Sequence, residues 1–291
     1  NDGFLSHLLK IKGADVLGVD ASEFMVKESQ KKIKAIQSIF NYNQSKKIKK
    51  IFGEADIIIA NNVFNHSDKP LDFLKGVYNL LDRDSIFIFE QPNFTVGVLS
   101  LKFDQIYHEH VSYFTARNIK SILDYSNLKI LSLAKNEYHG GSLRTIATKK
   151  DSKLKEIKIN EFINFENKKN IYKLSFYKKM MRKINVKKIK LFDTLLDLVS
   201  KGYVISGIGA AAKSNTFLTY YGLNNDIINF ITDASKFKQK KYTPVTRIVI
   251  KDDKELIKYS KIACIILSWN ISNLVIDKII KLNKKIKIIY T

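Results

Sequence analysis

Strand-like and helix-like segments alternate along the first part of the chain, and this alternation limits its possible folds more than any other feature. Apolar segments with the composition of buried strands occur at 14–20, 35–40, 55–64 and 85–92. Stretches with apolar residues at helical spacing lie before and between them, at 4–12, 22–33, 43–51 and 70–81. Strands separated by helices are joined by crossover connections, which place them parallel in a sheet. The pattern therefore predicts an α/β fold built on a parallel sheet.

The pattern becomes less regular after Pro92 and then resumes. An irregular insertion contains the segment FDQIYHEHVSYFT at 103–115. A predicted helix at 115–126 and two predicted strands, at 129–138 and 142–150, complete the first domain.

The rest of the chain divides into a lysine-rich stretch and a second strand–helix pattern. Residues 151–200 carry apolar residues at helical spacing, which predicts connecting helices. The second pattern starts near 202 and has strand-like segments at 227–233, 247–250, 261–269 and 285–290. We predict a first domain at 1–150, a helical linker at 151–200 and a smaller doubly wound domain at 201–291.

The chain opens on a turn and not on a strand. Asn1 is not a methionine, and the first turn leads directly into a predicted helix. An α/β unit normally begins with a strand, so we expect the natural N-terminus to be missing and the chain to be a fragment.

The composition is strongly basic, with 50 Lys plus Arg against 28 Asp plus Glu and a formal charge of +22 over 291 residues. Only five of the cations are arginine, the residue suited to forked contacts with phosphates and bases. Lysine occurs in almost every segment, which favours a compositional bias over a designed patch. We therefore expect no nucleic-acid partner.

Hydropathy and cysteine content indicate the compartment. No apolar run approaches the roughly 20 residues that a membrane-spanning helix needs, so no membrane partner is expected. Cys264 is the only cysteine, which excludes an internal disulfide and a cysteine-rich zinc site. Apolar residues make up 45% of the chain, enough for a sizeable core, so we expect a soluble globular protein of the cytoplasm.

A glycine turn and an acidic residue suggest a nucleotide site. Asp2 and Gly3 precede the first predicted helix, and Asp20 ends the strand that follows it. In nucleotide-binding α/β folds the ligand lies over such a turn, and an acid at the end of the second strand binds ribose hydroxyls. Asp20 could equally cap the helix that begins near Ser22, and Gly3 could serve only the turn. Spacing alone leaves both interpretations open.

Histidines gather near the ends of predicted strands. His66 follows one strand, and His108 and His110 flank Glu109 in the segment IYHEH, beside Tyr107. The His-x-His spacing could suggest metal ligands, but no cysteine or HExxH motif accompanies it, so we predict no metal site. Imidazole titrates near neutral pH, and a neighbouring phenol or carboxylate can orient it. We favour an acid–base site over histidines that only satisfy buried backbone groups.

The segment HGGSLR, from His139 to Arg144, is a weaker candidate. Gly140 and Gly141 could let backbone amides approach an anion that Arg144 also binds. The two glycines could equally form only a hairpin turn.

The segment GIGAAAK, from Gly207 to Lys213, follows a predicted strand and precedes a predicted helix. It fits the form G-x-G-x-x-A, and Asp233 ends the next strand at about the spacing of a nicotinamide dinucleotide site. A helix N-terminus carrying Lys213 would bind the diphosphate of a nucleotide sugar just as well. A packing turn without a ligand is the third interpretation.

A family resemblance connects these motifs. Taken in order, NDGFLSHLL, VLGVDAS, NNVFNHSD, FEQP, FDQIYHEHVSYFT and YHGGSLR resemble the C-methyltransferases that act on nucleotide-linked keto sugars. GIGAAAKSNTFLTYYG, FITDASKFKQ and the SWN at 268–270 are similar to that family's second Rossmann-like domain. The resemblance implies a class I methyltransferase fold with a Rossmann-like parallel sheet that binds S-adenosylmethionine, followed by a smaller Rossmann-like domain.

The resemblance also implies roles for individual residues. The cofactor S-adenosylmethionine would be bound by Asp2, Gly3, Asp20, Asn61 and Asn62. His110 would remove the proton next to the ketone of a nucleotide-linked keto-deoxysugar, in a pocket lined by Tyr107, Glu109 and His66. The substrate would contact His139, Gly140, Arg144 and Lys213.

The chain departs from this family in three places. Members usually begin with a cysteine-rich zinc module that also supplies an active-site tyrosine, so we expect no zinc in this fragment and catalysis could be impaired. YTPVTRIVI at 242–250 replaces a stretch richer in glycine and proline, and Asn93 stands where an aromatic residue is common. The alternative functions are an NAD-dependent oxidoreductase that uses the GIGAAAK turn and a non-catalytic nucleotide-sugar-binding fragment. Nothing in the sequence indicates an oligomeric state.

Overall fold

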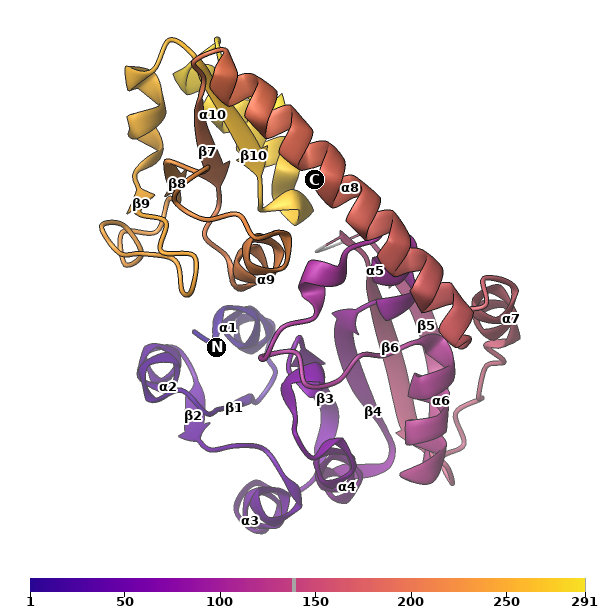
Figure 1. Cartoon of the computed structure of the whole chain (residues 1–291). Coiled ribbons are helices and arrows are strands. Elements are labelled where there is room, and N and C mark those ends of the chain that lie inside the picture. The colour runs from indigo at the N-terminus through magenta and orange to yellow at the C-terminus, as the bar shows by residue number, and fades with distance from the viewer. Residues whose placement is uncertain (138–139, 291) are drawn as a thin grey trace. The chain divides into compact units, whose positions relative to one another are not determined.

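A computed structural model describes residues 1–137 and 140–290, and the chain forms two compact units (Figure 1). The first unit consists of Asn1–Gln91, Ala116–Ala134 and Arg144–Ile159. The second unit consists of Pro92–Thr115, Lys135–Leu143 and Asn160–Thr291. The limits of these units differ from the domain boundaries predicted from the sequence. The predicted boundaries remain a prediction.

The first unit contains parallel strand pairs, as the alternating pattern predicts. β1 (Leu17–Asp20) pairs in parallel with β2 (Lys34–Gln37), and β3 (Ala55–Asn61) pairs in parallel with β4 (Leu81–Pro92). A four-stranded sheet has the order β3-β4-β6-β5 and includes β5 (Leu128–Asn136) and β6 (Ser142–Lys149).

The predicted α/β fold with parallel strands is confirmed, and β1 and β2 form a two-stranded sheet of their own. Strands belong to one sheet only when they lie within hydrogen-bonding distance of a neighbour, and β1 pairs with β2 alone among the described residues. Ile57 and Ile59 on the edge strand β3 are exposed. Local periodicity identifies the strands but does not determine which of them pair.

The helices of the first unit begin with recognisable signals. They are α1 (Phe4–Ile11), α2 (Glu23–Gln30), α3 (Tyr42–Phe52), α4 (Pro70–Leu80) and α6 (Ala116–Tyr125), with a 3₁₀ turn, η1 (Phe64–His66). The Ser22 hydroxyl accepts a hydrogen bond from the Met25 N–H, and the Asn41 side chain accepts one from the Gln44 N–H. Such caps satisfy N–H groups that lack a partner within the helix.

Aromatic side chains fill the core between β4 and its neighbours. Phe87 and Phe89 lie two residues apart on β4, point to the same face and stack with ring centroids 4.7 Å apart. Phe64 packs on Phe89 at 5.5 Å and Phe73 packs on Phe64 at 5.4 Å. These contacts fix the segment after β3 against β4, where several predicted site residues lie.

The sheet of the second unit is parallel, with the order β11-β10-β7-β8-β9. Counted from the first of these strands, this is the order 3-2-1-4-5 of a doubly wound fold, so the predicted second Rossmann-like domain is confirmed. Its strands are β7 (Val204–Ile208), β8 (Phe230–Thr232), β9 (Ile250–Lys251), β10 (Ile262–Ile266) and β11 (Lys287–Ile289).

Helices cover both faces of this sheet. Ala263 and Ile265 of β10 belong to one buried cluster with Leu195 and Leu218, from α8 (Leu174–Ser200) and α9 (Ala212–Tyr221). Ile262, Cys264 and Ile266 alternate with them and pack in a second cluster with residues of α10 (Ser272–Leu282) and the 3₁₀ turn η4 (Asp253–Lys258). Alternation of this kind is what a strand buried on both faces requires.

The insertion after β4 belongs to the second unit. It contains α5 (Phe94–Leu99) and the 3₁₀ turn η2 (Phe103–Gln105). The Thr95 hydroxyl donates to a carboxylate oxygen of Glu166 on α7 (Asn160–Lys168) at 2.9 Å, and Val98 is buried in the same cluster as α8. These contacts explain why the insertion joins the second unit and not the strand that it follows.

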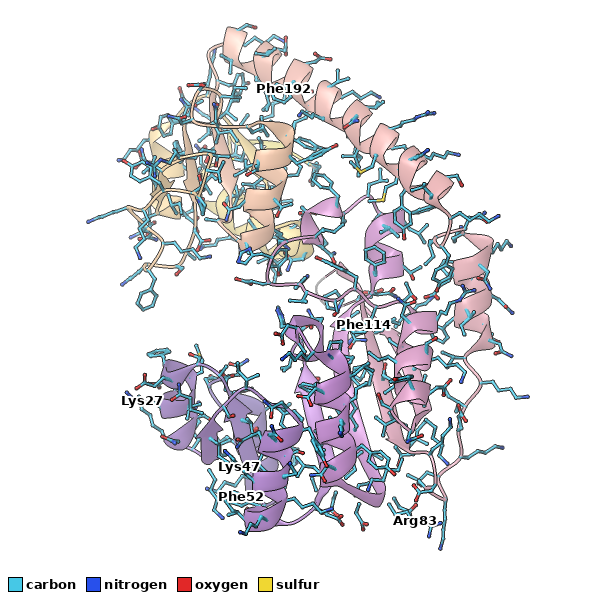
Figure 2. All side chains as sticks on the ribbon, turned by 60° about the horizontal axis from the view of Figure 1, so that its bottom comes forward. Lys27, Lys47, Phe52, Arg83, Phe114 and Phe192 are labelled. Atoms are coloured by element: carbon cyan, nitrogen blue, oxygen red, sulfur yellow. The ribbon has the colours of Figure 1, made fainter. Side chains whose placement is uncertain are left out.

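Surface lysines extend from many different elements. Lys27 on α2 and Lys47 on α3 both project outward (Figure 2). Lys27 also pairs with Glu23 one helical turn earlier, at 2.6 Å. In the part of the chain that the structure describes, no helix combines the length and the apolar run that crossing a bilayer would require.

The segment that departs from the family pattern is backbone-strained. The strand predicted at 247–250 starts later, at Ile250 of β9, and Arg247 has a φ of 56°. Val245 has a φ of 63°, and the Thr246 N–H donates to the Pro244 carbonyl at 2.7 Å across it. A β-branched residue is a genuine outlier in this region.

We expect Val245→Gly to raise the free energy of unfolding by about 1 kcal/mol, because glycine adopts a positive φ without the steric cost that valine has there. Val245 is 78% exposed, so little packing is lost. Urea unfolding measures the change. Val186→Gly, at an exposed position within α8, is the matched control and should lower stability. An unchanged or lower unfolding midpoint for Val245→Gly would contradict the strain.

Candidate functional site

The turn before α1 depends on Gly3. Its φ is 74°, and a Cβ added there would lie 2.6 Å from the hydroxyl oxygen of Ser29 on α2. The carboxylate of Asp2 accepts a hydrogen bond from the Phe4 N–H at 3.2 Å, and the Lys32 ammonium lies 3.8 Å from it. Gly3 therefore lets the turn approach α2 closely, while Asp2 holds the start of α1.

Asp20 ends β1 and serves the turn that follows. One carboxylate oxygen accepts a hydrogen bond from the Ser22 N–H at 2.8 Å, and the other pairs with the amino group of Asn1. Burial raises the pKa of Asp20, but these hydrogen bonds outweigh it and lower the pKa below its ordinary value. The carboxylate stays ionised at neutral pH and remains partly exposed at the carboxyl end of its strand.

Asn61 and Asn62 lie at the carboxyl end of β3. Asn61 is level with Glu90 of β4, and the Asn62 N–H donates to the Glu90 carbonyl at 2.7 Å. Asn62 has a φ of 52°, a left-handed conformation that asparagine tolerates better than most residues. His66 ends the 3₁₀ turn that follows. The structure thus brings these predicted residues together at one end of the first unit's larger sheet.

Arg144 pairs with Glu90 on the neighbouring strand. Its Nε donates to a carboxylate oxygen of Glu90 at 2.7 Å, and the Glu90 side chain is only 6% exposed. The guanidinium is half exposed, so part of its hydrogen-bonding surface faces solvent. Sequence reasoning identified Arg144 as an anion contact but missed this internal partner.

His110 and Tyr107 form the most directed hydrogen-bond arrangement in the second unit. His110 Nδ1 lies 3.1 Å from the Gln105 carbonyl oxygen, and His110 Nε2 lies 2.9 Å from the Tyr107 hydroxyl. A carbonyl oxygen can only accept, so Nδ1 carries the proton and Nε2 is left as an acceptor for the Tyr107 O–H. The tautomer therefore presents a basic nitrogen next to a phenol.

His108 and Glu109, which lie between Tyr107 and His110 in the sequence, have exposed side chains. The His108 side chain is 87% exposed, and its Nε2 lies 4.0 Å from a carboxylate oxygen of Glu109. Burial, and then the charge of Glu109, raises the pKa of Tyr107 to about 12. Glu109 thus helps to keep the phenol protonated, so that Tyr107 can donate a hydrogen bond.

The histidines of IYHEH belong to no group of metal-ligating side chains among the described residues. Within residues 1–137 and 140–290, no three His, Cys, Asp or Glu side chains gather closely enough to hold a metal ion.

The glycine turn of the second unit is tightly packed. Gly209 has a φ of 92°, and a Cβ added there would lie 1.7 Å from the hydroxyl oxygen of Ser268. In dinucleotide sites the second glycine leaves room for a pyrophosphate, whereas here the Ser268 side chain takes that room. The carboxylate of Asp233 accepts a hydrogen bond from the Ala210 N–H of the same turn at 2.9 Å. Both contacts favour the packing interpretation over a dinucleotide site.

Lys213 turns toward Trp269. Its ammonium lies 4.4 Å from the centroid of the indole ring and contacts the side-chain oxygen of Asn270. Burial lowers the pKa of Lys213 to about 8, and the charge of Asp104 partly opposes this change. Gly140 packs on the same indole ring, since a Cβ there would lie 2.2 Å from it. His139, predicted beside Gly140, lies outside the described residues.

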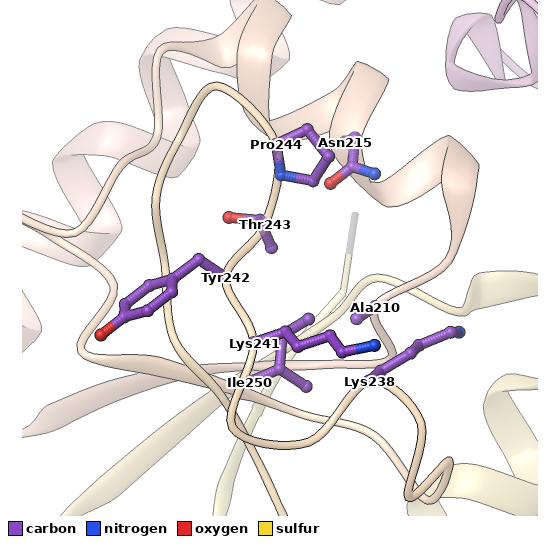
Figure 3. A pocket seen from close by; sticks show the side chains of 8 residues that line it. All are labelled: Ala210, Asn215, Lys238, Lys241, Tyr242, Thr243, Pro244 and Ile250. Atoms are coloured by element: carbon purple, nitrogen blue, oxygen red, sulfur yellow. The ribbon is translucent and has the colours of Figure 1, made fainter.

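A pocket of about 230 Å³ opens beside the glycine turn. Figure 3 shows the side chains of Lys238 and Lys241 on one side of it and those of Asn215 and Pro244 on the other. Lys238 also pairs with Asp233 at 3.2 Å. Sequence reasoning missed this lysine pair, because lysine is too frequent in the chain for its position to stand out.

The predicted site residues divide between the two units. Those expected to bind the cofactor, together with His66 and Arg144, belong to the first unit. Tyr107, Glu109, His110 and Lys213 belong to the second. The sequence analysis gave no role to Asp104 or Trp269. Trp269 is distinguished in the sequence as the single tryptophan, whereas Asp104 is distinguished only in the structure, as a buried acid.

Comparison with solved structures gives only weak matches. An S-adenosylmethionine-dependent methyltransferase from Anabaena variabilis matches with a TM-score of 0.41 and 17% identity, over 51% of this chain and 73% of that chain. Magnesium protoporphyrin IX methyltransferase from Synechocystis matches with a TM-score of 0.40 and 21% identity, over 51% of this chain and 70% of that chain. The family assignment therefore rests on sequence comparison.

Sequence comparison covers nearly the whole chain. C-methyltransferase NovU from Streptomyces niveus is 24% identical over 280 residues, which are 95% of this chain, and this chain spans 66% of the length of NovU. A family model described as a methyltransferase domain matches residues 1–133. A model described as the C-methyltransferase C-terminal domain matches residues 137–289, more than half of the chain. The predicted resemblance is confirmed at this level, and the chain belongs to the C-methyltransferase family that this C-terminal domain defines.

Proposed function

We propose that the protein is an S-adenosylmethionine-dependent C-methyltransferase that acts on a nucleotide-linked keto-deoxysugar. The observation that carries the proposal is the arrangement of His110 between the Gln105 carbonyl and the Tyr107 hydroxyl. It orients the imidazole with Nδ1 toward a carbonyl and Nε2 toward a phenol that stays protonated. A base and a hydrogen-bond donor side by side are what deprotonation next to a ketone requires.

The first unit offers residues that suit S-adenosylmethionine. The ionised, partly exposed carboxylate of Asp20 can accept hydrogen bonds from ribose hydroxyls. Gly3 forms the turn at the start of α1, where its φ of 74° favours glycine and the absence of a side chain leaves room for Ser29. We assign cofactor binding to Asp2, Gly3, Asp20, Asn61 and Asn62. When bound, the cofactor supplies an electrophilic methyl group.

The proposed reaction begins with proton transfer to His110. As the C–H bond next to the ketone breaks, Nε2 takes the proton and the electron pair moves into an enolate. The Tyr107 O–H, which points at Nε2 in the free protein, turns to donate to the enolate oxygen as negative charge develops there. The enolate carbon would then take the methyl group, whose bond to the cofactor sulfur would break so that S-adenosylhomocysteine leaves, while the protein aligns the reactants and excludes water.

In the second unit, we assign substrate contacts to Gly140 and Lys213, together with His139. Arg144, in the first unit, keeps its predicted role as an anion contact. The ammonium groups of Lys238 and Lys241 line a pocket that can accept an anionic group such as a diphosphate. Glu109 would line the reacting pocket beside His110.

We expect Asp20→Ala to raise the dissociation constant for S-adenosylmethionine about tenfold or more, because hydrogen bonds to a charged group contribute about 1.5–3 kcal/mol each. Isothermal titration calorimetry measures the change. Asp15→Ala removes an exposed acid before the same strand and should leave the affinity unaltered. Equal affinities for the Asp20 variant and the unmodified protein would refute the ribose role.

The function itself is tested with a panel of nucleotide-linked 4-keto sugars and S-adenosylmethionine. Mass spectrometry should detect the replacement of one hydrogen by a methyl group on carbon, and the corresponding alcohols should not react because they cannot form an enolate. In deuterated water and without the cofactor, the same ketones should exchange the hydrogen next to the carbonyl. Reduction or oxidation of the sugar with a nicotinamide cofactor, and no methylation, would instead support an oxidoreductase.

A further inference from the structure

Trp269 is the only tryptophan in the chain and connects two segments that are distant in sequence. It begins the 3₁₀ turn η5 (Trp269–Ile271) after β10. Its indole Nε1–H donates to a carboxylate oxygen of Asp104 at 2.6 Å, a contact between residues 165 positions apart. Both residues belong to the second unit. The short distance is typical of a hydrogen bond to an ionised acceptor.

Asp104 lies directly before the carbonyl that holds His110. It is 3% exposed, in the middle of the 3₁₀ turn Phe103–Gln105. The following residue, Gln105, accepts the hydrogen bond from His110 Nδ1. The Gln105 carbonyl belongs to the planar peptide group whose Ile106 N–H donates to the Phe103 carbonyl at 2.9 Å, so its direction follows from the geometry of this turn. Fixing the Asp104 side chain therefore restrains the Gln105 carbonyl.

The indole ring is itself held from several sides. The ammonium groups of Lys102 and Lys213 lie 4.6 Å and 4.4 Å from its centroid, distances at which a cation is attracted to the ring face. Gly140 packs on the ring edge, where a side chain would not fit. The ring thus cannot turn freely, and its N–H direction is fixed.

We propose that Trp269 is a positioning residue for His110: through Asp104 it holds the Gln105 carbonyl, which keeps His110 in the tautomer whose proton is on Nδ1 and whose Nε2 accepts the hydrogen bond from Tyr107. The effect on turnover rests on the proposed function, whereas the effect on the tautomer does not. Nothing in the sequence joins these residues, since Trp269 follows the fourth strand of the C-terminal sheet and His110 lies in the insertion.

The first test reads the tautomer directly. The ¹⁵N chemical shifts of His110 in histidine-labelled protein, assigned by comparison with His110→Gln, distinguish protonation at Nδ1 from protonation at Nε2. We expect Nδ1 protonation to dominate in the unmodified protein. In Trp269→Phe, which keeps a ring but loses the N–H, the ratio of the two tautomers should fall about fivefold, the effect of one hydrogen bond of about 1 kcal/mol. Asp104→Ala should do the same.

A matched control removes a polar atom elsewhere in the second unit. Tyr259 donates to Glu255 and stacks on Phe230, away from this cluster. Tyr259→Phe should leave the His110 tautomer unaltered. An unchanged tautomer ratio in Trp269→Phe would overturn the proposal, whatever the activity of the protein.

The second test measures turnover in the same variants. Trp269→Phe should lower kcat about tenfold or more, because small displacements of a reacting group are costly, and should change cofactor affinity little, because the residues assigned to the cofactor belong to the first unit. The kcat of the double variant Trp269→Phe/Asp104→Ala should be no lower than that of the less active single variant, since both substitutions remove the same hydrogen bond. If the fold-decreases in kcat of the two single variants multiply in the double variant, the two residues act separately and the proposed route through Asp104 is contradicted. If instead His110→Ala keeps full turnover, the proposed function fails while the tautomer measurement still decides the role of Trp269.

Discussion

We expect His110→Ala to lower turnover of the keto sugar by about a thousandfold, because a positioned general base contributes roughly 10²–10⁴ in rate. The variant removes the only ring nitrogen that faces Tyr107 within this hydrogen-bond arrangement, and the phenol, whose pKa is raised to about 12, is a poor substitute at neutral pH. Steady-state methylation followed by mass spectrometry measures the loss. Cofactor affinity should stay nearly unchanged, since the residues assigned to the cofactor belong to the first unit.

His108→Ala is the matched control for this variant. The two histidines are two positions apart, but the His108 side chain is 87% exposed and its nearest ionic partner is Glu109. We expect normal turnover from it. Full activity of His110→Ala, or an equal loss in both variants, would show that the base lies elsewhere.

The second large effect concerns the glycine turn of the second unit. We expect Gly209→Ala to lower the free energy of unfolding by about 3 kcal/mol, the sum of a conformational cost of about 1–2 kcal/mol and an overpacking cost of about 1–3 kcal/mol. The φ of Gly209 is 92°, and the added Cβ would lie 1.7 Å from the hydroxyl oxygen of Ser268. Urea unfolding monitored by far-UV circular dichroism measures the loss.

Two further variants separate these costs. Gly222 caps α9 with a φ of 73°, and a Cβ added there would meet no atom within 4 Å among the described residues, so Gly222→Ala should show the conformational cost alone. Adding Ser268→Gly to Gly209→Ala should recover most of the overpacking cost. If Gly209→Ala and Gly222→Ala lose equal stability, Ser268 does not restrict the turn and the space beside Gly209 is available to a ligand.

Local sequence patterns predicted most helices and strands of the structure. The apolar run at 85–92 lies within β4, and the stretch at 70–81 contains α4, which begins at Pro70. Such segments are determined by side chains a few positions apart, since helix and strand periods are short. α10, at Ser272–Leu282, is the main helix that the sequence analysis did not predict.

The sequence predicted which residues belong to the candidate site better than it predicted the contacts between them. The Tyr107–His110 pair lies within one short segment, so its proximity follows from the sequence. The partner of Arg144 is Glu90, 54 positions away, and no local pattern indicates that pairing. The GIGAAAK motif indicated a phosphate site or a packing turn equally well, and the position of Ser268 favours the second interpretation.

The sequence by itself determined the α/β class and the second Rossmann-like domain, because each depends on periodicity. The choice of His110 as candidate base came from the family resemblance and stays a prediction. Only the tertiary structure decided that β1 and β2 stand apart from the larger sheet, that the insertion joins the second unit, and that Trp269 reaches Asp104. These outcomes depend on contacts between residues far apart in the chain. Their formation requires the whole fold to bring the segments together, and no short stretch of sequence carries that information.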